Sequence, residues 1–170
     1  TINSTMRQDN AIWNILDQLG GQSIVLNVPG TYPAEEFDGS MVTGMLTPSA
    51  DNDFTHPPEL RDRLDEYSLD SWWQMLPFLV YSQTRPNKAI NIANDVADGR
   101  IDLAKMLMSE TDWDLAFLVL RITDTVQHFL WNNEELVLAM YKNIDQQLGA
   151  IQEEFDDDNI VVLSDHGFRS

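Results

Sequence analysis

The chain has 170 residues, of which 43% are apolar and 9% aromatic; this composition suffices for a domain with a core and disfavours a disordered chain. Its 28 acidic and 10 basic residues give a net charge of −18, which disfavours binding to a nucleic-acid polymer because such a polymer needs a basic face. The sequence has no cysteine, which excludes disulfides and thiolate metal sites within it.

The first third of the chain predicts a helix, a strand and then a long irregular segment. Residues 10–19 carry apolar side chains on one helical face, and Gly20 with Gly21 ends that helix. Residues 23–28 (SIVLNV) are typical of a buried strand, which Pro29 and Gly30 end. Residues 29–85 are interpreted as a loop-like or cap-like excursion, because segments of this length with little regular structure usually serve a function.

Within the excursion we expect only short elements. Residues 40–42 predict a short strand, and residues 57–66 predict a short helix with proline in its first turn. Bulky apolar residues follow at 72–79, and we expect them to pack in a core, with a role in lining a substrate pocket as the alternative.

The second half of the chain alternates helices and strands. Residues 87–108 predict a long helix, and 115–122 a central parallel strand. Residues 134–155 predict an amphipathic helix, and 160–163 another buried strand. This alternation predicts an α/β fold with a mostly parallel sheet flanked by helices, in which residues 1–170 form a single segment.

Chemically active side chains follow the two strands of the second half. Asp124 and His128 come after the first strand, one helical turn apart, and Asp165 and His166 come after the second. Ligands of open α/β sheets bind at the carboxyl ends of strands, and Asp and His are ligands that Zn²⁺ accepts. Adjacent strand residues point to opposite faces, so Asp165 and His166 can share an ion only if the chain turns, which Gly167 permits.

Each pair alone is weak evidence, because an Asp-to-His spacing of four residues also arises when aspartate caps a helix and histidine is merely exposed. The two pairs together predict a metal site. His56 lies in a Thr-His-Pro-Pro stretch, where we expect an exposed loop histidine. Arg121 could contact a substrate phosphate, although pairing with a carboxylate is the expectation we favour.

Three stretches resemble one known family: "TDTVQHFLW" (123–131), "LSDHGF" (163–168) and "LNVPGTYPAEEFDGSMVTGMLTPS" (26–49). They are similar to the motifs of the alkaline phosphatase superfamily, and within it to the type I phosphodiesterase/nucleotide pyrophosphatase family. The resemblance keeps the family's order over most of the chain. It implies an alkaline-phosphatase-like fold, which is incomplete here. It also implies that the substrate of the protein is a small phosphate ester or a nucleotide.

The resemblance also implies a phosphoester hydrolase with two divalent metal ions, Zn²⁺ first and Mn²⁺ or Mg²⁺ as alternatives, and a covalent phospho-enzyme. Asp124 and His128 match two ligands of one ion, and Asp165 and His166 match two ligands of the other. No residue of the segment matches the family's nucleophile or its remaining ligands, so we expect the nucleophile upstream of Thr1, a late histidine beyond Ser170, and no catalysis by this segment alone. A non-catalytic, truncated α/β module that binds metal or a partner is the alternative.

The acidic charge also predicts an adaptation to salt. Like charges repel each other in dilute salt, and near 1 M salt the Debye length falls to about 3 Å. We interpret the chain as a cytoplasmic protein of a halophile, with an ordinary acidic protein as the alternative. No signal peptide or membrane span is visible, so we expect no membrane partner, and a homo-oligomer is possible through exposed sheet edges.

Overall fold

The computed structural model describes residues 3–48, 53–64, 67–69 and 72–168. The side chains of Trp72 and Trp73, which belong to the apolar run at 72–79, lie outside the described part. The chain divides into two compact units, which are described separately. Unit 1 contains Thr1–Leu76 and Gly99–Leu120, and unit 2 contains Pro77–Asp98 and Arg121–Ser170. The helices α2 (Trp72–Thr84) and α3 (Pro86–Glu110) each contribute to both units.

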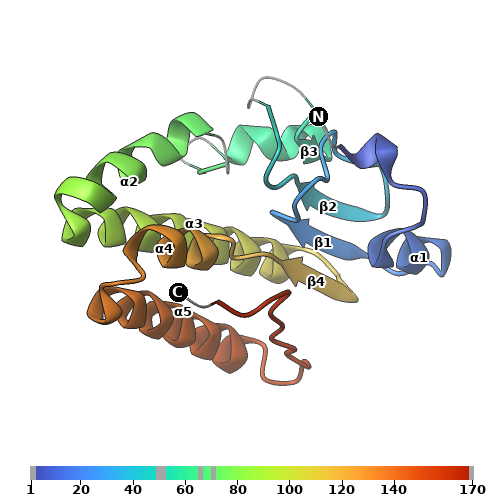
Figure 1. The fold of residues 1–170 in the computed structure, drawn as a ribbon. Helices are drawn as coiled ribbons and strands as arrows, with labels where there is room; N and C mark the ends of the chain where they lie inside the picture. The colour runs from blue at the N-terminus through green and yellow to red at the C-terminus, as the bar shows by residue number, and fades with distance from the viewer. Residues whose placement is uncertain (1–2, 49–52, 65–66, 70–71, 169–170) are drawn as a thin grey trace. The chain divides into compact units, whose positions relative to one another are not determined.

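Unit 1 is built on a four-stranded sheet in the order β3-β2-β1-β4 (Figure 1). The strands are β1 (Ser23–Leu26), β2 (Gly39–Val42), β3 (Thr55–His56) and β4 (Leu115–Leu118). β1 pairs in parallel with both β2 and β4, while β3 runs antiparallel to β2. The expected α/β fold with a mostly parallel open sheet and flanking helices is confirmed.

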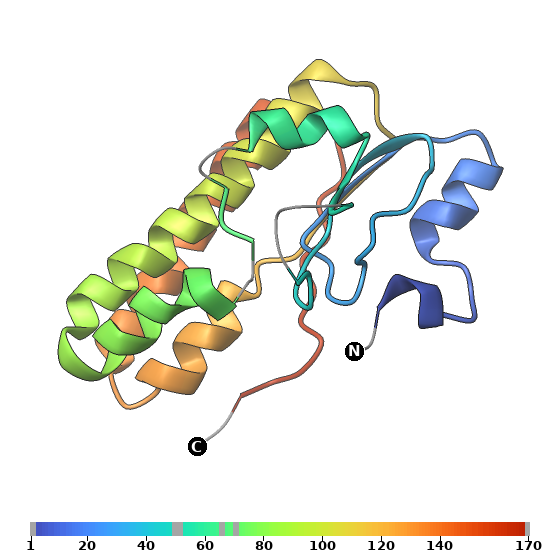
Figure 2. The same cartoon turned by 90° about the horizontal axis from the view of Figure 1, so that it is seen from above.

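Alternating side chains of β1 and β2 build a core on each face of the sheet. On one face, Ile24, Leu26 and Val42 pack in a cluster that includes Leu103 and Leu107 of α3 (Pro86–Glu110). On the opposite face, Val25 and Met41 cluster with Trp13 of α1 (Ile12–Gln18). Figure 2 shows α1 and the part of α3 that belongs to unit 1 on opposite sides of the sheet. Burying one such side chain contributes roughly 1.5–3 kcal/mol to stability. Because β1 and β2 bury side chains on both faces of the sheet, packing stabilises them from two sides.

A glycine of the motif at 26–49 is explained by close backbone approach. Gly44 follows β2, where the chain passes the end of β1. A Cβ atom at this position would lie 2.2 Å from the carbonyl oxygen of Asn27, which is too close for any side chain. Only glycine therefore fits here.

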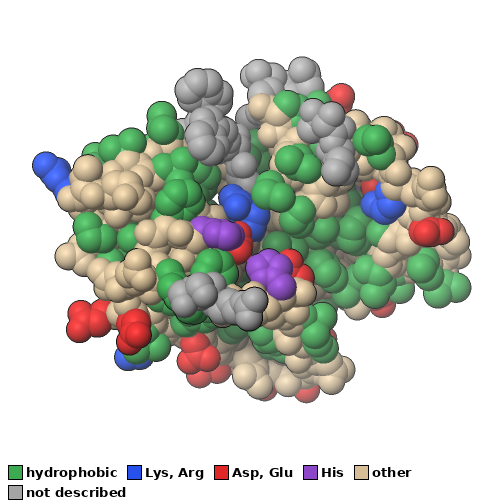
Figure 3. Space-filling model, in the orientation of Figure 1, with side chains coloured by type: hydrophobic (Ala, Val, Ile, Leu, Met, Phe, Trp, Pro, Cys, Tyr) green, Lys and Arg blue, Asp and Glu red, His purple; other side chains and the backbone are tan. Residues whose placement is uncertain are grey.

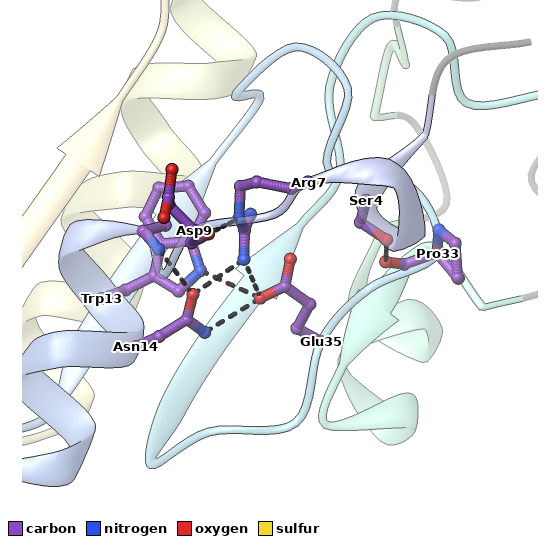
Figure 4. Close-up of polar contacts among 8 residues, drawn as sticks. Ser4, Arg7, Asp9, Trp13, Asn14, Pro33 and Glu35 are labelled. Carbon is purple, nitrogen blue, oxygen red and sulfur yellow. Dashed lines mark hydrogen bonds and ion pairs between the residues drawn. The ribbon is translucent and has the colours of Figure 1, made fainter.

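The N-terminal segment is fastened to the loop that follows β1, as Figure 4 shows. Ser4, in the short 3₁₀ helix η1 (Ser4–Met6), donates a hydrogen bond from Oγ to the carbonyl oxygen of Pro33 at 2.8 Å. Glu35 Oε2 accepts hydrogen bonds from Arg7 at 2.7 Å and from Asn14 Nδ2 at 2.9 Å. Burial raises the pKa of Glu35, but the hydrogen bonds from Arg7 and Asn14 outweigh it, so the pKa lies below its ordinary value of 4.5.

The segment at 29–85 contains more regular structure than short isolated elements. The expected strand at 40–42 is confirmed as part of β2, and the predicted helix at 57–66 is a 3₁₀ helix, η2 (Pro58–Arg63); residues 65–66 lie outside the described part. The apolar run at 72–79 lies in α2 (Trp72–Thr84), where Met75 and Phe78 are buried as expected.

The expectation of an exposed loop histidine at position 56 is wrong. His56 lies in β3, which the sequence analysis did not predict, and its side chain is only half-exposed. Its Nε2 is 2.9 Å from the carbonyl oxygen of Phe37, and the Phe37 ring packs against the imidazole at 5.6 Å. Pairing of β3 with β2, which are distant in sequence, determines this environment.

Unit 2 is helical and holds the candidate site. It contains α4 (Ile122–Leu130) and α5 (Glu134–Glu154), together with parts of α2 and α3. The predicted amphipathic helix at 134–155 is confirmed: Met140, Ile144 and Ile151 of α5 are buried. Asp98 of α3 accepts hydrogen bonds from Asn143 at 2.8 Å and from Gln147 at 3.0 Å, which fastens α5 to α3 within this unit.

Two predicted strands differ from the structure. The central strand predicted at 115–122 is the shorter β4, which ends at Leu118 and lies at an edge of the described sheet, and α4 begins at Ile122. The buried strand predicted at 160–163 is wrong: this stretch is not a strand, and Val161, Val162 and Leu163 are 74%, 71% and 81% exposed. A run of four apolar residues has strand propensity, but it forms a strand only where a neighbouring strand offers its backbone groups.

Candidate active-site pocket

The first residue pair of the site lies on α4. Asp124 is in the first turn of this helix and His128 in its last, so their side chains share one face. Nε2 of His128 lies 3.3 Å from Oδ1 of Asp124. That oxygen is buried and receives no hydrogen bond from the described residues. A buried carboxylate oxygen without a donor is a position where a cation would compensate the cost of desolvation.

The second pair lies in a turn near the end of the described chain. The backbone N–H of His166 donates to Oδ1 of Asp165 at 3.0 Å, and Ser164 Oγ donates to the carbonyl oxygen of His166 at 2.5 Å. Nδ1 of His166 lies 3.0 Å from the carbonyl oxygen of Gly167. Because a carbonyl only accepts, Nδ1 carries the proton there, and in the neutral ring the lone pair is on Nε2.

This turn brings the two side chains of the second pair toward each other, as expected for a chain that bends near Gly167. Nε2 of His166 is 3.7 Å from Oδ2 of Asp165. Both side chains are accessible, with 59% of His166 and 90% of Asp165 exposed. In the space-filling view of Figure 3, histidine side chains reach the visible surface next to acidic ones.

Asp124, Asp165 and His166 line one pocket of about 170 Å³. Its other lining residues are Thr123, Gln127, Tyr141, Ser164, Gly167 and Phe168. The two sequence motifs, whose aspartates (124 and 165) lie 41 positions apart, therefore meet at one place. They meet through the turn at 164–168 and not through the ends of two strands, because residues 160–163 form no strand.

His128 stands beside this pocket and does not line it. Its ring meets the Phe168 ring edge to face at 5.0 Å between centroids. The Phe168 ring also packs against Trp131 at 4.8 Å. Aromatic contacts of this kind contribute about 0.5–1.5 kcal/mol each, so Phe168 links the second motif to the end of α4.

The charge of the pocket is unbalanced toward the negative. Asp124 and Asp165 are its acidic residues, and His166 is the side chain that can become cationic. The pKa of His166 is raised, first by the hydrogen bond to the Gly167 carbonyl and then by the charges of Asp165 and Asp124. Asp124 thus acts on His166 across the pocket.

The oxygen and nitrogen atoms of the pocket are of the kinds that bind a divalent metal, but they are fewer than a complete metal site needs. Carboxylate oxygens and imidazole nitrogens are accepted by Zn²⁺, which usually takes at least three protein ligands. Among the residues that the structure describes, no group of three or more His, Asp or Glu side chains is placed to hold one ion. The two Asp–His pairs, Asp124 with His128 and Asp165 with His166, each offer two donor side chains.

Sequence reasoning missed Gln127 and Tyr141, which both line the pocket. The spacing of Gln127 could have indicated its position, because it lies three residues after Asp124 and so shares that helical face. Nothing in the sequence indicated Tyr141, whose place depends on how α5 packs on α4. Arg121 donates a hydrogen bond from a guanidinium nitrogen to Thr125 Oγ1 at 3.0 Å, so this contact goes to a hydroxyl of α4.

No helix within the described residues has the length and apolar character needed to cross a membrane.

No curated protein and no solved structure matches the chain. The model of one family, type I phosphodiesterase/nucleotide pyrophosphatase, matches residues 3–170. The match covers the motifs at 123–131 and 163–168 and the sheet of unit 1. The chain therefore belongs to the type I phosphodiesterase/nucleotide pyrophosphatase family, in the alkaline phosphatase superfamily.

Proposed function

We propose that this chain is the central part of a metal-dependent phosphoester hydrolase that cleaves a small phosphodiester or a nucleotide. Family membership supports the phosphoester hydrolase function. The observation that carries the metal-dependent part is the pocket lined by Asp124, Asp165 and His166, in which two sequence-distant motifs meet. Its volume of about 170 Å³ is below the roughly 300–1,000 Å³ of pockets that enclose a drug-sized ligand, which suits a phosphoryl-sized group.

Asp124 with His128 would hold one divalent ion, and Asp165 with His166 would hold the other. Zn²⁺ is the first choice for these oxygen and nitrogen donors, with Mn²⁺ or Mg²⁺ as alternatives. When bound, such ions offset the negative charge of a phosphoryl group and of its transition state. Completion of each ligand set, and the nucleophile, are expected from parts of the protein outside residues 1–170.

The residues of this chain supply three things to the site. The carboxylates of Asp124 and Asp165 attract cations, and without cations they would repel a phosphate ester. The bond between Nδ1 of His166 and the Gly167 carbonyl holds the ring with Nε2 as the available donor atom. Phe168, packed on Trp131 and His128, ties the turn at 164–168 to α4.

The test uses the complete natural polypeptide that carries residues 1–170. Hydrolysis of a nitrophenyl phosphodiester should require Zn²⁺ or Mn²⁺ and stop with a chelator. Asp124→Ala and His166→Ala should each lower kcat/KM by at least a hundredfold, because they remove one ligand of a set. Asp145→Asn changes an exposed acid of α5 away from the pocket and should leave the rate unchanged. Activity that persists in Asp124→Ala would reject the proposed site.

A second candidate is a non-catalytic module that binds metal or a partner. The absence of a three-ligand group among the described residues favours it. The two candidates differ in one outcome: the module would bind Zn²⁺ through the same residues, yet the complete polypeptide would hydrolyse no phosphoester.

A further inference from the structure

Two neutral residues of the pocket are bonded to each other and have no role among the metal ligands. Gln127 of α4 and Tyr141 of α5 both line the pocket, and Nε2 of Gln127 donates to the hydroxyl oxygen of Tyr141 at 2.5 Å. Tyr141 is 45% exposed, so this contact does not serve to satisfy a buried group. A hydrogen bond between two accessible side chains adds little stability on its own.

Gln127 and Tyr141 have hydrogen-bond donors that their mutual bond does not use. An amide group has two N–H donors and a tyrosine has one O–H donor. The bond between them uses one of these three donors. With Gln127 as the donor, one amide N–H and the tyrosine O–H remain for other acceptors. In the structure the Tyr141 hydroxyl oxygen accepts from Gln127, so its own O–H proton is not used in this bond and can be donated to another acceptor.

The pocket gives these donors a specific task. Asp124 and Asp165 contribute only acceptors when ionised, and the Ser164 hydroxyl already donates to the His166 carbonyl. None of the described residues that line the pocket is lysine or arginine. A phosphate ester presents acceptor oxygens throughout, so a neutral donor that lines the pocket can meet an oxygen that the ions do not contact.

We propose that Tyr141, oriented by Gln127, donates a hydrogen bond to a phosphoryl oxygen of the substrate and so positions it in the pocket. This inference rests on the proposed function. Gln127 is a positioning residue, because it acts by holding the Tyr141 hydroxyl from one side. Because the Gln127 amide occupies one side of the hydroxyl oxygen, the O–H bond of Tyr141 points away from that amide.

Tyr141→Phe tests the proposal, because it removes the hydroxyl and keeps the ring. In the complete polypeptide with Zn²⁺, KM for a nitrophenyl phosphodiester should rise about tenfold, the usual order of effect for a hydrogen bond to a charged group. The inhibition constant of inorganic phosphate should rise by a similar factor, while kcat changes less. Gln127→Leu should have a smaller effect of the same kind. The double variant should resemble Tyr141→Phe, because the two residues act as one unit.

Tyr81→Phe is the matched control. Tyr81 lies on α2, accepts a hydrogen bond from Lys88 Nζ at 3.0 Å and does not line the pocket. It should leave KM and the inhibition by phosphate unchanged, and all variants should keep the melting temperature and the zinc content of the unaltered protein.

The outcomes separate this inference from the proposed function. If the unaltered protein hydrolyses the phosphodiester while Tyr141→Phe keeps its KM and phosphate inhibition within twofold, this inference is overturned and the proposed function stands. If the unaltered protein hydrolyses no phosphoester with Zn²⁺ or Mn²⁺, the proposed function fails and the inference falls with it. A parallel loss of melting temperature in Tyr141→Phe would assign the residue to structure and also overturn the inference.

Discussion

Nε2 of His128 lies 3.3 Å from Oδ1 of Asp124, one helical turn away on α4. Asp124 in turn shares a pocket with Asp165 and His166. Through these contacts, one residue connects both sequence motifs. The pairs differ in their support, because the first is held by a helix and the second by the hydrogen bonds of a turn.

Zinc should bind the 170-residue chain weakly and in a manner that depends on Asp124. Two ligands per ion are fewer than a structural or catalytic site uses, so we expect dissociation constants no tighter than about 1 µM. At about 100 times the dissociation constant, binding should add about 2.7 kcal/mol to the free energy of unfolding. Titration calorimetry and thermal melts measure both quantities.

Asp124→Asn should reduce the zinc-induced rise in melting temperature, because it removes a proposed ligand of one ion and leaves the proposed ligands of the other. Asp145→Asn, which removes the same charge from an exposed site of α5, serves as the control. If both variants lose the same part of the zinc-induced rise in melting temperature, zinc binds through the overall acidic charge and not through this site.

The isolated 170-residue chain should not hydrolyse a nitrophenyl phosphodiester, even with Zn²⁺ or Mn²⁺ in high salt. The physical reason is that each ligand pair is incomplete and that no nucleophile of the family's type has been matched within the segment. A sensitive absorbance assay at about 1 M salt measures this. Turnover that Asp124→Ala removes would contradict the prediction and place a nucleophile within residues 1–170.

Glu35→Gln should destabilise the protein at neutral pH. Oε2 of Glu35 accepts hydrogen bonds from Arg7 and Asn14, and hydrogen bonds to a charged group contribute roughly 1.5–3 kcal/mol. The side chain is 20% exposed, so we expect a loss of about 1–2 kcal/mol, near the lower end of that range. Urea unfolding at pH 7 measures it. Glu36→Gln, at the exposed neighbouring position, should cost nothing measurable.

The contribution of Glu35 should also depend on pH. Its pKa in the folded protein lies below the ordinary value of 4.5, so its stabilising effect is complete above about pH 4.5. The effect is lost as the pH falls through the lower pKa of the folded state. The difference in unfolding free energy between the unaltered protein and Glu35→Gln should therefore shrink in acid. A difference that grows on acidification would refute the assigned direction.

Stability should rise with salt into the molar range. The net charge of −18 produces repulsion that counterions screen. Sulfate should stabilise more than chloride at equal ionic strength, because it also strengthens apolar burial. Thermal melts across a salt series measure this. A melting temperature that stays flat or falls would remove the proposed adaptation to salt.

The same salt should promote self-association through the exposed apolar run at 160–163. Val161, Val162 and Leu163 are mostly exposed, and an extended apolar run is a template for pairing with another chain. Light scattering at about 1 M salt should show oligomers, and Val162→Asp should reduce them. A strictly monomeric protein under these conditions would contradict the prediction.

Several features of this protein could be predicted from local sequence because they depend on local physics. The helix at 134–155 follows from apolar spacing, and a strand within 23–28 from the apolar residues at 24–26; in the structure this strand, β1, ends at Leu26. The pairing of Asp124 with His128 follows from helical spacing alone. The helical predictions hold because a helix satisfies its backbone hydrogen bonds within its own segment.

Other features were decided by tertiary structure. The run at 160–163 has the composition of a strand, yet it is exposed and unpaired with any strand of the described chain, because a strand is completed only by a neighbour. His56 received a half-buried place because β3 pairs with β2. Tyr141 reaches the pocket because α5 packs on α4. Sequence spacing determined which residues could be ligands, whereas contacts between distant segments determined which of them share a pocket, because those contacts depend on packing that no local pattern encodes.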